Sequence, residues 1–134
     1  MRCAPEKYGL KKGGILRRKN LINVIHLNAD SNDPKGWYTG PWNSAVPAAV
    51  GYANEGINLE HFHAQMFEIY LVAQGESTAI VDGETVRLRA RDVLVVEPGE
   101  VHTFTDSTPD YFHFVIQTPF VAGDKRLGHK AETG

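Results

Sequence analysis

Three histidines and one glutamate constrain this chain more than any other feature, because their spacing demands a particular path of the backbone. His61 and His63 are two residues apart, so both side chains point to one face of an extended strand. Glu68 follows His63 by five residues, which is the wrong parity for that strand, so the chain must turn back between them. His102 arrives from farther along. Three imidazoles and a carboxylate are a complete ligand set for a divalent transition metal. We therefore predict a small β structure closed around one metal ion.

Short apolar runs separated by Gly, Pro, Asp and Asn fill the rest of the chain, and no long segment has a helical period. This pattern is typical of an all-β sandwich or barrel. The run 67–73 reads as the strand that returns after a turn over 64–66, and Asp82-Gly83 is a strong hairpin signal. Residues 29–40 are expected to form a loop. Further strands are expected at 21–27, 46–52, 57–63, 77–81, 85–88, 93–96, 101–105 and 111–118.

A chain of 134 residues is expected to form one domain. We divide it into a basic N-terminal arm over 1–20, which could pair as an extra strand, a barrel over 21–118 and a polar C-terminal tail over 119–134. The arm carries seven Lys and Arg against one acidic residue, whereas residues 21–123 carry four basic and thirteen acidic residues. An acidic body argues against specific nucleic-acid binding. The arm either contacts a partner, or is solvated, or packs on the acidic body.

The cysteine content bears on the compartment. The single cysteine, Cys3, excludes both an intramolecular disulfide and a cysteine-based zinc site. A reducing, cytoplasmic location is therefore expected. No stretch is apolar enough to span a bilayer, so we expect no membrane association. The first twelve residues also lack the apolar core of a secretory signal.

The region around the histidines resembles the first motif of the cupin family. That motif reads Gly, five residues, His-x-His, three or four residues, Glu, six residues, Gly. The matching residues here are His61, His63, Glu68 and Gly75. The leading Gly is displaced, because Gly56 lies one position late. The match is specific and includes both histidines of the pair and the glutamate.

The second cupin motif is matched less closely. Gly99 and His102 stand at its positions. Three of its residues are replaced, its Gly by Arg91, its Pro by Glu97 and its Asn by Asp106. These departures fall at turns, so they bear on loop shapes rather than on the ligands. The resemblance implies a double-stranded β-helix, the jelly roll of the small metal-binding cupins, as a single all-β domain with the metal near its middle.

Several metals suit this donor set. Imidazole with carboxylate fits Fe(II), Mn(II), Ni(II), Cu(II) or Zn(II). Four protein ligands leave one or two positions for water, substrate or dioxygen, which favours Fe(II) or Mn(II) over closed tetrahedral zinc. The alternative is a cupin that has lost its metal and keeps a hydrogen-bonded cluster. That alternative is costly, because an unpaired glutamate in an apolar barrel is hard to keep ionised.

Other side chains are candidates for the cavity around the metal. His113 could support the ligands or act as a general base, and the alternative is a strand histidine without chemistry. Tyr70 shares a strand face with Glu68, and Phe104 lies two residues after His102 on the same face. We therefore assign Tyr70, Phe104 and Gln65 to the substrate pocket, although each could equally serve packing or the turn.

A jelly roll supports many activities, so function is argued from the site. Our best hypothesis is a dioxygenase-type oxidoreductase acting on a small polar organic molecule in the barrel. Between residues 36 and 123 the only basic residues are Arg87, Arg89 and Arg91, near one hairpin, so we expect a neutral or weakly charged substrate. The alternatives are a module that senses a metabolite or metal without catalysis, and a sugar-phosphate isomerase. An apolar outer strand face predicts a homodimer.

Overall fold

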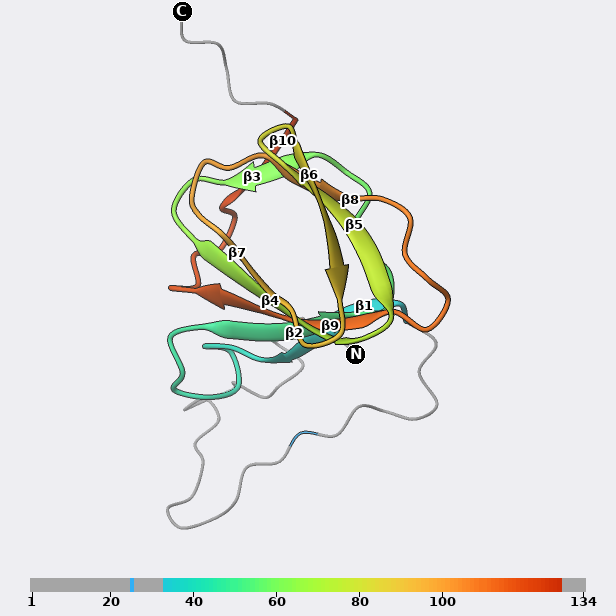
Figure 1. Cartoon of the computed structure of the whole chain (residues 1–134). Helices are drawn as coiled ribbons and strands as arrows, with labels where there is room; N and C mark the ends of the chain where they lie inside the picture. Colours follow the sequence, from blue (N-terminus) through green and yellow to red (C-terminus); the bar gives the residue numbers. More distant parts are fainter. Residues whose placement is uncertain (1–24, 26–32, 129–134) are drawn as a thin grey trace, which may run out of the picture.

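The structure is a computed structural model that describes residue 25 and residues 33–128, and the described chain forms strands and no helix (Figure 1). No described helix is therefore long and apolar enough to cross a membrane. The strands are β1 (Lys35–Thr39), β2 (Ala49–Ala53), β3 (His61–His63), β4 (Phe67–Gln74), β5 (Glu76–Val81), β6 (Glu84–Arg89), β7 (Val93–Val96), β8 (His102–Phe104), β9 (Phe112–Thr118) and β10 (Lys125–Leu127).

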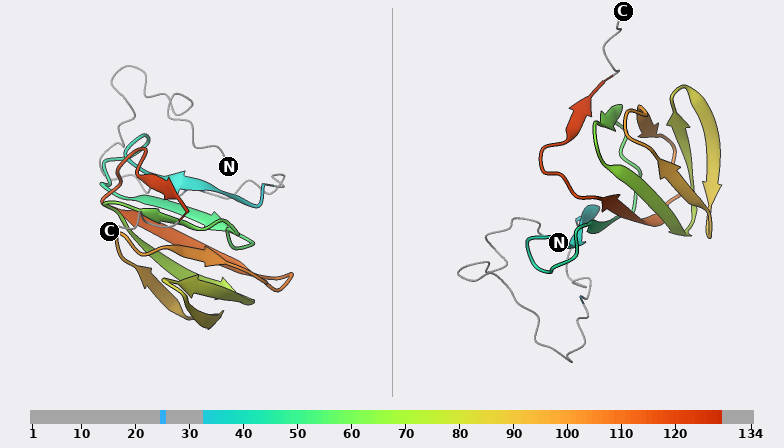
Figure 2. Two further views of the ribbon diagram at one scale, coloured as in Figure 1. Left: turned by 90° about the horizontal axis from the view of Figure 1, so that it is seen from above. Right: turned by 90° about the vertical axis from the view of Figure 1, so that its left-hand side faces the viewer.

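The strands form two antiparallel five-stranded sheets that face each other (Figures 1 and 2). Sheet A has the order β1-β2-β9-β4-β7, and sheet B has the order β10-β3-β8-β5-β6. Most consecutive strands lie in opposite sheets, so the chain winds back and forth between the two. This arrangement is a double-stranded β-helix, which confirms the predicted all-β fold class.

Strand pairing decides which side chains face the space between the sheets. In the pairing of β4 with β9, Glu68 lies opposite Gln117, and Tyr70 lies opposite Val115. Directly opposed residues share one face of a sheet. These four side chains are buried, so this face is the inner one. Tyr70 and Val115 belong to the apolar core, which also contains Val72, Ala79, Leu88, Val96, Phe104 and Tyr111.

The two turns singled out in the sequence keep left-handed backbone. Asp82 and Gly83 join β5 to β6 with φ angles of 48° and 86°, as a two-residue hairpin turn requires. Arg91, which replaces a motif glycine, has a φ of 82°. Its amide donates a hydrogen bond to the Val72 carbonyl over 2.8 Å. Arg91 thus adopts a left-handed conformation that favours glycine.

Two strands lie where the sequence predicted none, and the strand expected at 57–63 is limited to His61–His63. β1 lies inside the predicted loop 29–40, where Trp37, Tyr38 and Thr39 are strand-forming residues that outweigh Gly36. β10 lies inside the segment expected as a polar tail, and it pairs with β3. The predicted strand 21–27, apart from residue 25, and the basic arm 1–20 lie outside the described residues.

Candidate metal centre

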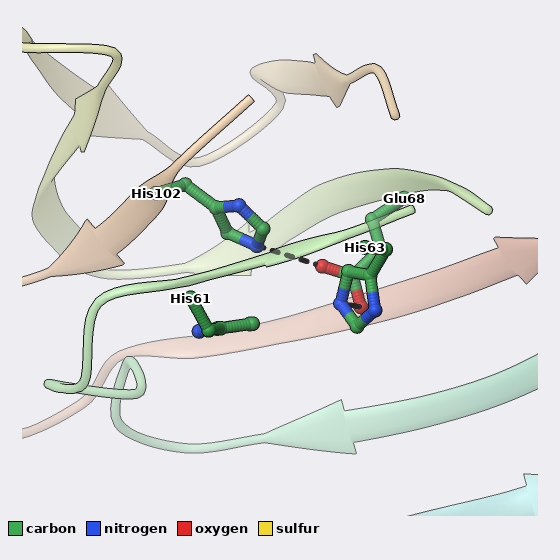
Figure 3. A group of neighbouring side chains, drawn as sticks. All are labelled: His61, His63, Glu68 and His102. Atoms are coloured by element: carbon green, nitrogen blue, oxygen red, sulfur yellow. Dashed lines mark hydrogen bonds and ion pairs between the residues drawn. The ribbon is translucent and has the colours of Figure 1, made fainter. Parts of the chain in front are cut away.

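The four predicted ligands meet in the space between the two sheets (Figure 3). His61 and His63 come from β3, and His102 comes from the neighbouring strand β8, directly opposite His61. Glu68 reaches the group from β4 in sheet A, because the chain turns back after His63 as its parity demanded. One ligand atom from each residue lies within 4.8 Å of all the others, and all four residues are buried.

The hydrogen bonds around the histidines fit a metal ion. Nδ1 of His61 lies 2.7 Å from the Leu59 carbonyl oxygen, and Nδ1 of His102 lies 2.9 Å from the Glu100 carbonyl oxygen. A neutral imidazole has a single N–H, so donation from Nδ1 leaves a lone pair on Nε2. Nε2 of His102 nevertheless lies 3.0 Å from a Glu68 oxygen. Either a proton on this Nε2 or a metal ion between the two atoms satisfies the contact, and the donor set suits a divalent metal.

His63 gives a second sign of a missing partner. Its Nδ1 is buried and has no hydrogen-bond partner. Its Nε2 lies 3.2 Å from Oε2 of Glu68, but the contact lacks hydrogen-bond geometry. Buried polar atoms are nearly always satisfied. The donor set therefore fits a metal held by His61, His63, Glu68 and His102.

Glu68 is held in its ionised form by its neighbours. The Tyr70 hydroxyl donates to Oε1 over 2.5 Å, and the Gln117 amide donates to Oε2 over 2.8 Å. Burial alone would raise the pKa of Glu68, but contacts with His102, His63 and Gln117 together place that pKa well below its usual range. Burial and the nearby carboxylate raise the pKa of Tyr70, so its hydroxyl keeps its proton.

Asp124 holds the turn that carries the ligands, and sequence reasoning missed it. Its carboxylate accepts hydrogen bonds from the amides of Ala64, Gln65 and Met66 over 3.2, 2.8 and 2.9 Å. Desolvation raises the pKa of Asp124, but these amides together lower it. The Asp124 carboxylate, a charged acceptor, therefore fixes the turn that joins His63 to Glu68.

A cavity of about 410 Å³ opens beside the four ligands. Tyr70 and His113 line it. Gln65 does not line it and is exposed, because its backbone N–H donates to Asp124 and holds the residue in the turn. Phe104 lies outside this cavity as well and packs in the core, with its ring 5.0 Å from that of Tyr70.

Two lysines also line the cavity, Lys35 from β1 and Lys125 from β10. Both lie just outside the range 36–123, in which the three arginines are the only basic residues. Those arginines do not line the cavity, and Arg87 pairs with Glu76 at 3.1 Å and with Asp106 at 3.3 Å. The expectation of a neutral or weakly charged substrate rested on a cavity without basic side chains, and the two lysines remove that basis.

His113 is a neutral group inside the cavity. Its Nδ1 lies 2.7 Å from the Tyr111 hydroxyl, and the residue is 2% exposed. Burial lowers the pKa of His113 to about 4, against a raising effect of Glu68. The imidazole is therefore neutral at pH 7, and one of its two ring nitrogens carries a lone pair. The direction of the hydrogen bond with Tyr111 determines which of the two ring nitrogens of His113 carries the proton.

We predict that the metal-free protein loses stability between pH 6.5 and about 4. Burial lowers the pKa values of His61 and His113 from 6.5 to about 4, so the unfolded state binds more protons in that range. Stability is then full above pH 6.5 and declines as the pH falls. The His113 shift corresponds to up to about 3 kcal/mol. Urea midpoints at about pH 7 and about pH 5 measure the effect. His113→Asn should reduce the pH dependence, and an equal dependence in both proteins would contradict the assignment.

Solved structures with similar folds include proteins of different activities. A variant of PAC13 from Streptomyces, solved with uridine, has a TM-score of 0.56 and 23% identity, covering 63% of this chain and 69% of PAC13. KdgF from Halomonas sp. has a TM-score of 0.60 and 17% identity, covering 75% and 97%. The DMSP lyase DddQ from Ruegeria pomeroyi DSS-3 has a TM-score of 0.59 and 21% identity, covering 77% and 56%. At these identities the likeness extends to the fold alone.

The sequence comparisons give the family. No curated protein matches the chain significantly. The family model described as the cupin domain matches residues 50–116, which contain all four ligand positions. That match spans half of the chain and agrees with the jelly roll and with its buried histidine and glutamate cluster. The chain therefore belongs to the cupin family.

Proposed function

We propose that this cupin is a metal-dependent enzyme that acts on a small polar organic molecule inside the barrel. One observation carries the proposal: a buried three-histidine, one-glutamate cluster and the neutral imidazole of His113 line or adjoin one cavity. When bound, the metal would act as a Lewis acid that polarises a substrate oxygen. A binding module without catalysis needs no buried base beside the ligands.

The residues around the metal support a proton-transfer reaction. His113 accepts a proton from the substrate, and the Tyr111 hydroxyl orients its ring through the 2.7 Å hydrogen bond. Tyr70 and Gln117 keep the Glu68 carboxylate in place. A Lewis acid beside a neutral base suits elimination or isomerisation next to a carbonyl or hydroxyl group. Solved relatives described as a nucleoside dehydratase and as a lyase show that this fold supports such chemistry.

A dioxygenase is the second candidate, and the donor set favours it. Three histidines and one carboxylate suit Fe(II) or Mn(II), with positions left for dioxygen and substrate. This reaction does not depend on His113 as a base. Oxygen consumption therefore separates the two candidates.

The test uses full-length protein purified anaerobically without added metal. Small hydroxy acids, keto acids and diketones are incubated with it in D2O, with and without oxygen. We expect turnover or deuterium exchange in both atmospheres, and His113→Asn should lower the rate by about 100- to 10,000-fold while the metal content stays unchanged. Turnover that requires oxygen would favour the dioxygenase. A bound ion without turnover or exchange across the panel would favour a sensing module.

We further propose that the protein is a homodimer joined through the outer face of sheet A. Val93, Val95 and Phe114 on this face are 57%, 50% and 37% exposed. Cross-strand pairs place them beside Ile69 and Leu71, so the surface is apolar across three neighbouring strands. A second copy is its natural occupant, because an uncharged sheet face matches itself about a two-fold axis.

The cytoplasmic location stays a prediction.

Light scattering after gel filtration tests the dimer. Val95→Glu should convert the dimer to a monomer, because it introduces two desolvated like charges at the interface. Val86→Glu is the matched control, since Val86 is 41% exposed on β6 of sheet B. A wild-type monomer, or equal dissociation of both variants, would overturn this interface.

A further inference from the structure

Lys35 and Lys125 lie on the edge strands of the two sheets. β1 ends sheet A and β10 ends sheet B, and Figure 2 shows both strands toward the same side of the barrel. Both lysines are exposed, and both line the cavity beside the metal cluster. They therefore stand at the mouth of the cavity, between solvent and the site.

Strand register shows why both side chains face inward. Lys35 lies opposite Ala53, and Ala53 lies opposite His113 on the next strand. Lys125 lies opposite His63. Because opposed residues share a face, Lys35 shares the face of His113, and Lys125 shares the face of a metal ligand.

Among the described residues, the ammonium groups of the two lysines have no oppositely charged partner. Neither ammonium group makes an ion pair or hydrogen bond within the part of the chain that the structure describes. The acidic groups that line the cavity, Glu68 and Asp124, are buried and already hydrogen-bonded. With two lysines and two acids, the lining is neutral, and a divalent metal would make it positive. An anion is therefore attracted to this cavity in spite of the acidic body around it.

We propose that Lys35 and Lys125 bind an anionic group of the substrate, which is therefore a small organic carboxylate or phosphate monoester. This inference rests on the proposed function and names its substrate class. The anionic group would lie at the cavity mouth, with the rest of the molecule extending toward the residues that would hold the metal, His61, His63 and Glu68. Trp37, Met66 and Phe120 also line the cavity and cover the carbon skeleton between these two points. A volume of about 410 Å³ suits a molecule of this size.

Calorimetric titration of the metal-loaded, full-length protein tests the inference. Inorganic phosphate and malonate are the anionic probes, and 1,2-propanediol is the neutral one. Lys35→Gln and Lys125→Gln should each weaken binding of the anions about fivefold, and the double variant should weaken it about 20-fold or more. The affinity for the neutral probe and the metal content should not change. Stronger binding of phosphate than of malonate assigns the phosphate monoester, and the reverse order assigns the carboxylate.

Arg126→Gln is the matched control, because Arg126 is the next residue on β10 and does not line the cavity. It removes the same charge, so an equal loss in this variant would mean general electrostatic attraction and would overturn the lysine site. Absence of anion binding by the metal-loaded wild type would overturn it as well. Failure of the proposed function has a different signature: anions still bind through the lysines, but no substrate turns over.

Discussion

Replacement of His61 by Ala is expected to reduce the bound metal from about one ion per chain to none. Nε2 of His61 is one of four donors, and its ring is fixed by the 2.7 Å contact between Nδ1 and the Leu59 carbonyl. Loss of residues that merely orient ligands costs about 10- to 100-fold in metal affinity, so loss of a ligand should cost more than about 100-fold. Two histidines and Glu68 would remain, and they would leave the ion with an additional open position.

Element-specific detection of the ion in anaerobically purified protein measures this effect. His113→Asn is the control, because His113 is a buried histidine in the same cavity that does not belong to the donor cluster. It should keep the wild-type metal content. Unchanged metal content in His61→Ala would refute the ligand assignment. An equal loss in both variants would mean that folding, rather than coordination, had failed.

The ligand cluster could be predicted because its geometry is largely local. The alternation of His61 and His63 along a strand and the parity of Glu68 follow from backbone geometry alone. A turn of three residues is short enough to be read from the sequence. Only His102 needed a long-range partner, and the resemblance to the second motif supplied its position. The structure places these four residues together.

The residues that support and surround the cluster could not be predicted, because they arrive through distant strand pairings. Asp124 is 58 residues from Met66, yet its carboxylate accepts the Met66 amide. Gln117 is 49 residues from Glu68. Lys35 and Lys125 enter the cavity because their short edge strands pair in a particular register. No periodicity in the sequence encodes such a register, since strands of five and three residues carry almost no pattern.

The shortness of the edge strands also explains why the sequence did not predict β1 and β10. β1 contains a glycine among aromatic residues, and β10 consists of Lys125, Arg126 and Leu127. Composition alone reads these segments as loop and tail. Pairing with β2 and β3 satisfies their backbone groups and makes them strands. Tertiary context thus outweighs local propensity at the edges, where the cavity opens.

Gly75→Ala is expected to destabilise the protein by about 2–5 kcal/mol, the largest stability effect that we predict for a single methyl group. Gly75 ends β4 with a φ of 76°, and a side chain in this conformation costs about 1–2 kcal/mol. A Cβ atom there would also lie 2.6 Å from Cα and 2.7 Å from the amide nitrogen of Tyr111. Backbone atoms cannot rotate away, so the loop that carries Tyr111 must shift, at about 1–3 kcal/mol.

Gly83→Ala measures the conformational part of this effect alone, so the difference between the two variants gives the steric part. Gly83 has a similar φ of 86°, but a Cβ atom there would meet nothing within 4 Å. Its substitution should therefore cost only the conformational term of about 1–2 kcal/mol. Urea unfolding of both variants gives the difference, and equal losses would show that the approach of Tyr111 to Gly75 is unimportant. Because the Tyr111 hydroxyl holds His113, Gly75→Ala should also slow turnover beyond its effect on stability, whereas Gly83→Ala should not.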